Sequence, residues 1–179
     1  MNIIGYGKLS NWMNKRYWNH SHILSGEKQV TQEKLESLNT VLKLKNFMKG
    51  IKYSSDSFHG IFHWWQNPLT TIHRGKGDCE DAALLWYDRL FAIGYEAKIV
   101  LYYKCRFGIN WPMHFICIWK ENNQYYTWWR LASNSDNNWY SVPDNDDDYN
   151  ILLNDYCCAK NYSKYRVLKY NEFMKYKEN

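Results

Sequence analysis

The stretch 75–83, Gly-Lys-Gly-Asp-Cys-Glu-Asp-Ala-Ala, constrains the fold of this chain more than any other. Its glycines lead into Asp78, whose carboxylate can cap a helix by accepting N–H groups of the first turn. From Cys79 onward the apolar residues return at helical spacing, and Gly94 follows where helices commonly end. The sequence therefore predicts a helix over 79–93 that begins at a cysteine.

A cysteine in this position is a candidate nucleophile. The dipole of the predicted helix lowers the pKa of a thiol at its N-terminus. The carboxylates of Asp78, Glu80 and Asp81 act in the opposite sense, because negative neighbours disfavour a thiolate. Asp81 also occupies the capping-box position three residues after the N-cap. The chemistry of Cys79 therefore depends on which groups the fold places beside it.

Composition places the chain in a broad class. Its 179 residues are expected to form a single domain, 1–179, and its net charge of +5 is too small and too dispersed to indicate nucleic-acid binding. The five cysteines follow neither a disulfide pattern nor a zinc pattern, which is typical of a reducing compartment. With no secretory leader or long apolar segment, we expect a cytoplasmic protein without a membrane partner. The oligomeric state is not predicted.

The remaining pattern predicts helices before strands, with residues 1–30 forming an irregular lead-in or a short helix packed on the core. Stripes at helical spacing predict helices over 31–50 and 56–66, joined to the cysteine helix by a loop at 69–76. Runs rich in β-formers then predict an antiparallel sheet. Its strands are expected at 96–103, 113–119, 125–131 and 166–170, its loops at 104–112 and 132–150, and a further helix at 150–159. The fold class is therefore expected to be α+β, with N-terminal helices packed on the sheet.

A cysteine nucleophile needs a base to take its proton. His114 begins the strand predicted at 113–119, which the chain reaches after returning from the cysteine helix. His73, on the loop before Cys79, is the other nearby histidine. A helix-borne cysteine facing a strand-borne histidine is an arrangement used for acyl transfer. The alternative is a buried structural cysteine and a hydrogen-bonded histidine.

The segment Gly77-Asp78-Cys79-Glu80-Asp81-Ala82-Ala83, with Met113-His114-Phe115 after it, resembles the transglutaminase-like superfamily. The resemblance is closest to bacterial transglutaminase-like cysteine proteinases and covers about residues 45–136. It implies a papain-like α+β fold, in which the cysteine helix packs on an antiparallel sheet that carries the histidine.

The resemblance also implies the rest of a catalytic site. The family carries an acid near the end of the strand after the histidine strand, where this chain has none. We expect Asn134 to orient His114 instead, with Asp136 as the alternative. The backbone N–H of Cys79 is expected to stabilise the oxyanion, with Trp65 or Gln66 as a second donor. No cofactor is expected, except that some family members bind calcium through the acids that correspond to Asp78 and Glu80.

These residues predict a thiol acyl-transfer enzyme that acts on amide bonds of proteins or peptides through a Cys-His-Asn/Asp site. With water as the acceptor the enzyme would be a cysteine peptidase or amidase, which we favour. The alternatives are a transglutaminase or glutamine deamidase using the same site. A catalytically inactive binding module that keeps the fold is the third alternative.

Overall fold

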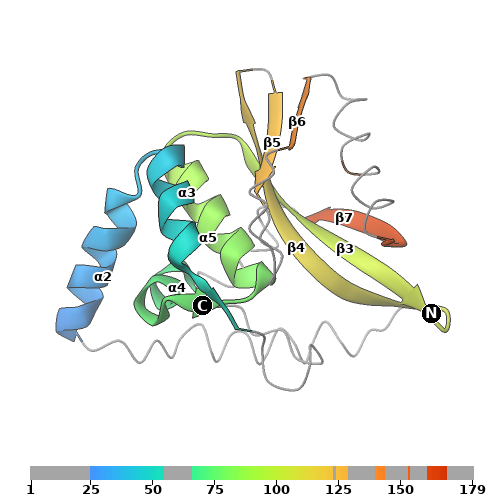
Figure 1. Ribbon diagram of the computed structural model, residues 1–179, viewed down its shortest axis with the longest axis horizontal. Coiled ribbons are helices and arrows are strands. Elements are labelled where there is room, and N and C mark those ends of the chain that lie inside the picture. The colour runs from blue at the N-terminus through green and yellow to red at the C-terminus, as the bar shows by residue number, and fades with distance from the viewer. Residues whose placement is uncertain are drawn as a thin grey trace.

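The computed structural model describes residues 25–54, 66–122, 124–128, 140–143, 153 and 161–168. Helices lie on one side of a five-stranded antiparallel sheet (Figure 1). The predicted α+β class with an antiparallel sheet is confirmed.

The helices are α2 (Ser25–Ser37), α3 (Val41–Gly50), α4 (Pro68–Arg74) and α5 (Cys79–Ala92). The main sheet contains β3 (Ala97–Arg106), β4 (Ile109–Glu121), β5 (Gln124–Trp128), β6 (Tyr140–Pro143) and β7 (Lys164–Leu168).

The single helix predicted over 31–50 is wrong, because the chain forms two helices there. The first helix, α2, ends at Ser37, and Thr40 then caps α3 by accepting a hydrogen bond from the N–H of Lys43 at 3.2 Å. A threonine that satisfies a first-turn N–H favours a new helix start over continuation of the old one. None of the helices in the described segments is both long and apolar enough to cross a membrane.

The loop predicted at 69–76 is also largely wrong, because most of it is α4. Asn67 caps this helix by accepting a hydrogen bond from the N–H of Thr70 at 2.8 Å, and Pro68 occupies its first turn. Proline is well tolerated there because the first N–H groups of a helix have no partner within it. Gly75, at a φ of 61°, ends α4. The helix predicted at 56–66 lies outside the described residues apart from its last position.

A short parallel pairing brings the chain to the cysteine helix. Strand β1 (Lys52–Tyr53) pairs with β2 (Lys76–Gly77), so that the segment after α3 lies beside the segment before Cys79. The helix α5 then runs from Cys79 to Ala92, close to the predicted 79–93. Gly94, at a φ of 90°, follows it as expected.

The sheet has the strand order β6-β5-β4-β3-β7. The loop predicted at 104–112 is wrong, because β3 and β4 continue through it and Arg106 pairs directly with Ile109. Only Phe107 and Gly108 remain as the turn. Pairing between two strands depends on contacts across the hairpin, which the composition of this segment does not reveal.

The hairpin predicted between 113–119 and 125–131 is confirmed where it is described, as β4 and β5. The loop predicted at 132–150 contains β6, and β7 begins two residues before the predicted 166–170. The helix predicted at 150–159 lies outside the described residues except for Leu153.

Both faces of the sheet are buried. On one face, side chains of β3 and β4 pack against α5 and α3, and the Trp86 and Trp119 rings stack with centroids 5.2 Å apart. On the other face, Tyr102 and its neighbours pack against Leu153 and against β7. The cysteine helix is therefore held against the sheet by a large apolar contact.

Candidate active site

The turn before α5 is built around a cap, as the sequence predicts. Asp78 is the N-cap residue and Cys79 is the first helical residue. The backbone N–H of Asp78 donates to Oδ2 of Asp81 at 3.3 Å, which is one arm of a capping box. These contacts fix the direction in which the helix starts, and hence the position of the cysteine.

Asp81 holds a distant part of the chain against this turn. Its side chain is fully buried, and its Oδ1 accepts a hydrogen bond from the backbone N–H of Gln66 at 2.7 Å. The side-chain amide of Gln66 donates to the other carboxylate oxygen. Arg74 then donates to Oε1 of Gln66 at 3.3 Å. Asp81 therefore joins the start of α4 to the start of α5.

Gly77 is required by the close approach of Asp81. A Cβ atom at Gly77 would lie 2.8 Å from both Cβ and Oδ2 of Asp81. That separation is too short for real atoms, and Asp81 is held by its own hydrogen bonds. The absence of a side chain at this position allows the carboxylate to reach Gln66.

We expect Gly77→Ala to lower the free energy of unfolding by about 1–3 kcal/mol, because the new methyl group overpacks a fixed carboxylate. Urea denaturation measures this change. Gly50→Ala is the matched control, since a Cβ there meets nothing within 4 Å. It should leave stability unchanged or raise it by up to about 1 kcal/mol. Equal effects of the two substitutions would contradict the close approach.

A cavity opens beside the cysteine. Cys79 and His114 both line it, and so do apolar side chains of α3, α5 and β4, including Met48, Trp86 and Phe115. The sulfur of Cys79 is hydrogen-bonded to the backbone of Phe115, the residue next to His114. The structure therefore places the predicted nucleophile beside the strand that carries the predicted base.

The cysteine is held as a thiol. Burial is the largest cause that raises its pKa well above the ordinary value, and the Glu80 and Asp78 carboxylates add to it. The Cys79 Sγ donates to Oε2 of Glu80 at 3.2 Å. The hydrogen bond to the backbone of Phe115 lowers the pKa but does not reverse the direction. The lowering of the Cys79 pKa expected from the helix dipole is therefore outweighed, first by burial of the thiol and then by the carboxylates of Glu80, which is itself buried, and of Asp78.

His114 lies just after an irregularity in β4. It pairs with Tyr102, whereas the next pair joins Tyr103 to Pro112, so that Met113 is an extra residue on β4. Such β-bulges redirect side chains and are frequent beside active sites. Pro112, which lacks an N–H for the ladder, is the sequence signal for this bulge. His73, the alternative histidine, lies on α4 with its Nε2 4.0 Å from a carboxylate oxygen of Glu27.

Of the remaining predicted site residues, Trp65, Gln66, Asn134 and Asp136, only Gln66 is among the described residues. Gln66 is buried on Asp81 and is not among the lining residues described above. Trp65, Asn134 and Asp136 lie outside the described residues. Their roles therefore stay predictions.

The described part of the chain does not contain a complete calcium site. Within those segments, His, Cys, Asp and Glu side chains do not gather in groups of three or more that could hold a metal ion. Asp78 and Glu80 are two carboxylates, whereas Ca²⁺ takes six to eight oxygen ligands. These two residues alone do not fit a calcium ion.

Comparisons with known proteins place the chain near a few solved structures. No protein-family model matches it, and no curated protein sequence matches it. Three structures of LapG from Legionella pneumophila are similar, one described as calcium-bound and one as EGTA-treated. Their identities are 20%, 19% and 19% and their TM-scores 0.40, 0.41 and 0.41. The matches cover 71% of this chain and 71%, 69% and 70% of the LapG chains. Such values do not assign a family to this chain.

Proposed function

We propose that this chain is a thiol acyl-transfer enzyme of the transglutaminase-like superfamily that hydrolyses amide bonds of proteins or peptides. One observation carries the proposal: the sulfur of Cys79 lies against the backbone of Phe115, and Cys79 and His114 line the same cavity. The Gly-Asp-Cys-Glu-Asp motif and the bulge before His114 support it. Water is the proposed acceptor, which makes the enzyme a cysteine peptidase or amidase.

The proposed reaction begins from the protonated thiol. His114 takes the proton of Cys79 as the sulfur attacks the carbonyl carbon of the amide, forming a C–S bond. His114 then gives the proton to the leaving nitrogen, the C–N bond breaks, and a thioester remains. Water, deprotonated by His114, attacks the thioester, releasing the carboxylic acid and restoring the thiol.

Two further groups complete the proposed site. The backbone N–H of Cys79 belongs to the first turn of α5, where N–H groups have no partner within the helix, so it is available for the developing oxyanion. Asn134, or Asp136 as the alternative, would orient the ring of His114. Calcium at Asp78 and Glu80 stays a prediction and enters no step of this reaction.

A peptide carrying a vinyl sulfone tests the Cys79–His114 pair directly. We expect a small library of such peptides to modify Cys79 and to do so about tenfold or more slowly in His114→Ala, because proton transfer to a base is lost. Peptide mass mapping of the adduct gives the rate at each cysteine.

Two other cysteines serve as internal references in the same experiment. Cys105 is exposed, so its modification should be indifferent to His114. Cys117 is buried and its pKa is raised by that burial, so it should stay unmodified while the chain is folded. Equal modification of Cys79 and Cys105, unaffected by His114→Ala, would favour the inactive binding module. The raised pKa of Cys79 is the observation that motivates this second candidate.

The acceptor is tested by incubating the protein with a proteome and a labelled primary amine. Hydrolysis predicts new peptide termini that disappear in Cys79→Ala. Amine incorporation that depends on Cys79 would instead favour a transglutaminase, and conversion of glutamine to glutamate would favour a deamidase. Mass spectrometry of the same digest distinguishes the three results.

A further inference from the structure

The hairpin of β3 and β4 carries an aromatic side chain at its tip in a conformation that does not suit it. Phe107 and Gly108 are the only turn residues, with φ of 53° and 73°. Positive φ at both central positions is the mark of a type I′ turn, which strongly prefers Asn-Gly. A phenylalanine is not favoured in this backbone conformation, because a positive φ is sterically unfavourable for a bulky side chain. Its presence is therefore not explained by the turn.

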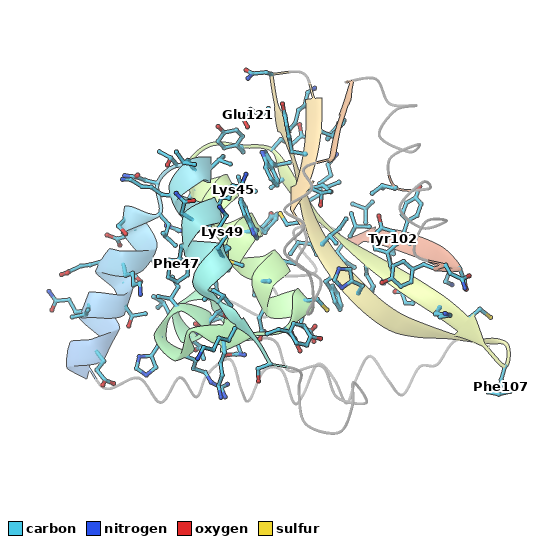
Figure 2. The ribbon with its side chains drawn as sticks, in the orientation of Figure 1. Lys45, Phe47, Lys49, Tyr102, Phe107 and Glu121 are labelled. Atoms are coloured by element: carbon cyan, nitrogen blue, oxygen red, sulfur yellow. The ribbon has the colours of Figure 1, made fainter. Side chains whose placement is uncertain are left out.

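Packing does not explain the residue either. Phe107 is completely exposed, with a relative accessibility of 102%. Figure 2 shows it at the far end of the hairpin, pointing away from the rest of the molecule. The adjacent strand β7 pairs with β3 only as far as Tyr103, and Ser163 accepts a hydrogen bond from the N–H of Cys105. The turn therefore projects beyond the body of the sheet.

Within the hairpin and β7, the charged residues toward the projecting end are all basic. The sequence has no acidic residue from Ala97 to Lys120, the whole of the hairpin except its last residue, Glu121, which lies at the opposite end from Phe107. Lys104 lies on β3 three residues before Phe107, and on β7 Lys164 is exposed with its Nζ 5.3 Å from the centroid of the Tyr103 ring. The tip of the hairpin therefore carries an exposed aromatic side chain, with lysines further from the end. This arrangement is complementary to a surface with an apolar interior and negatively charged outer groups.

We propose that the tip of the β3–β4 hairpin binds the surface of an anionic lipid bilayer, with Phe107 entering the headgroup region and Lys104 and Lys164 facing the lipid phosphates. The tip is convex, so a protein partner would need a matching pocket, whereas a bilayer needs none. The backbone groups flanking the turn are paired by the hairpin ladder, which keeps the cost of entering the headgroup region low. The sequence suggested no membrane partner because it contains no membrane-spanning segment, but surface binding requires none. This contact does not depend on the chemistry proposed for Cys79.

Vesicle sedimentation of the full chain tests this inference. We expect binding to phosphatidylcholine vesicles that contain phosphatidylserine, weak binding to phosphatidylcholine alone, and loss of binding as salt is raised. Phe107→Asn should reduce binding roughly tenfold. Lys104→Gln and Lys164→Gln should each reduce it about fivefold.

The same substitution separates binding from folding. Phe107→Asn creates the Asn-Gly pair that a type I′ turn prefers, so the thermal midpoint should stay constant or rise. Phe91→Ala is the matched control, because Phe91 is 57% exposed on α5, outside the hairpin, and should bind vesicles like the wild type.

Several results would overturn the inference. These are no binding of the wild-type chain to anionic vesicles, equal binding by Phe107→Asn, or an equal loss with Phe91→Ala. Binding of the tip to poly-glutamate but not to vesicles would assign it to an acidic protein and would also overturn the lipid proposal.

Discussion

Asp81→Ala is expected to lower the free energy of unfolding by about 3–5 kcal/mol, because it removes the acceptor of three buried or part-buried donors at once. These are the backbone N–H and side-chain amide of Gln66 and the backbone N–H of Asp78. Leaving such donors without an acceptor costs about 1–3 kcal/mol each, and the costs overlap because the donors are adjacent. Urea denaturation measures the loss.

Two further variants serve as controls for Asp81→Ala. Asp81→Asn keeps one acceptor oxygen and the side-chain volume, so it should lose less than Asp81→Ala. Asp88→Ala, on the same helix, removes a part-buried acid paired with its neighbour Arg89, which keeps its hydrogen bond to the carbonyl oxygen of Leu35, so it should cost less than Asp81→Ala. A loss for Asp81→Ala as small as that for Asp88→Ala would show that the carboxylate does not hold the two helix starts together.

The features that sequence reasoning found are local ones. The helix from Cys79 to Ala92 was predictable because its cap, its apolar spacing and Gly94 all lie within one segment and agree. The histidine strand was predictable in part, because the β-formers after His114 signal it. In the structure, Cys79 and His114 line the same cavity.

Where the sequence prediction failed, the deciding contacts are distant in the chain. Gln66 and Asp81 are fifteen positions apart, and no periodic pattern links them. Asn67-Pro68 follows the helix predicted at 56–66 and is typical of a helix end, although the same pair serves as the cap and first turn of α4. The far half of the β3–β4 hairpin was missed because Phe107-Gly108 is not a recognisable turn pair. The hairpin is set by tertiary pairing that overrides a local signal, whereas the cap of α4 is a local contact that competes with another local signal.

The burial of Glu80 is a feature of the site that its position in the sequence does not reveal. An acid in the first turn of a helix is expected to face solvent and to stabilise the helix dipole. Here Glu80 is 1% exposed and accepts a hydrogen bond from the thiol of Cys79. Sequence position alone cannot distinguish an exposed acid from one packed against its neighbour, and the packed Glu80 adds to the rise in the Cys79 pKa that burial of the thiol causes.

Glu80→Gln is therefore expected to lower the pKa of Cys79 and to raise its rate of alkylation by iodoacetamide at neutral pH on the order of tenfold. Glutamine keeps a hydrogen-bond acceptor but removes the negative charge that disfavours the thiolate. The rate for the wild type should be low at neutral pH and climb as pH rises, since the raised pKa keeps the thiol protonated over a wider range. In Glu80→Gln the climb should begin at lower pH, whereas Cys105 in the same tube should react as before.

The control for this result is Asp88→Asn, which removes a carboxylate from the same helix away from the first turn and should leave the alkylation of Cys79 unchanged. Repeating the measurement with Ca²⁺ and with EGTA tests the calcium prediction, because a cation held by Asp78 and Glu80 would produce the same lowering of the Cys79 pKa without a substitution. An unchanged or slower rate in Glu80→Gln would mean that the charge of Glu80 does not contribute to holding the proton on Cys79. Burial of the thiol and the carboxylate of Asp78 would then account for the raised pKa.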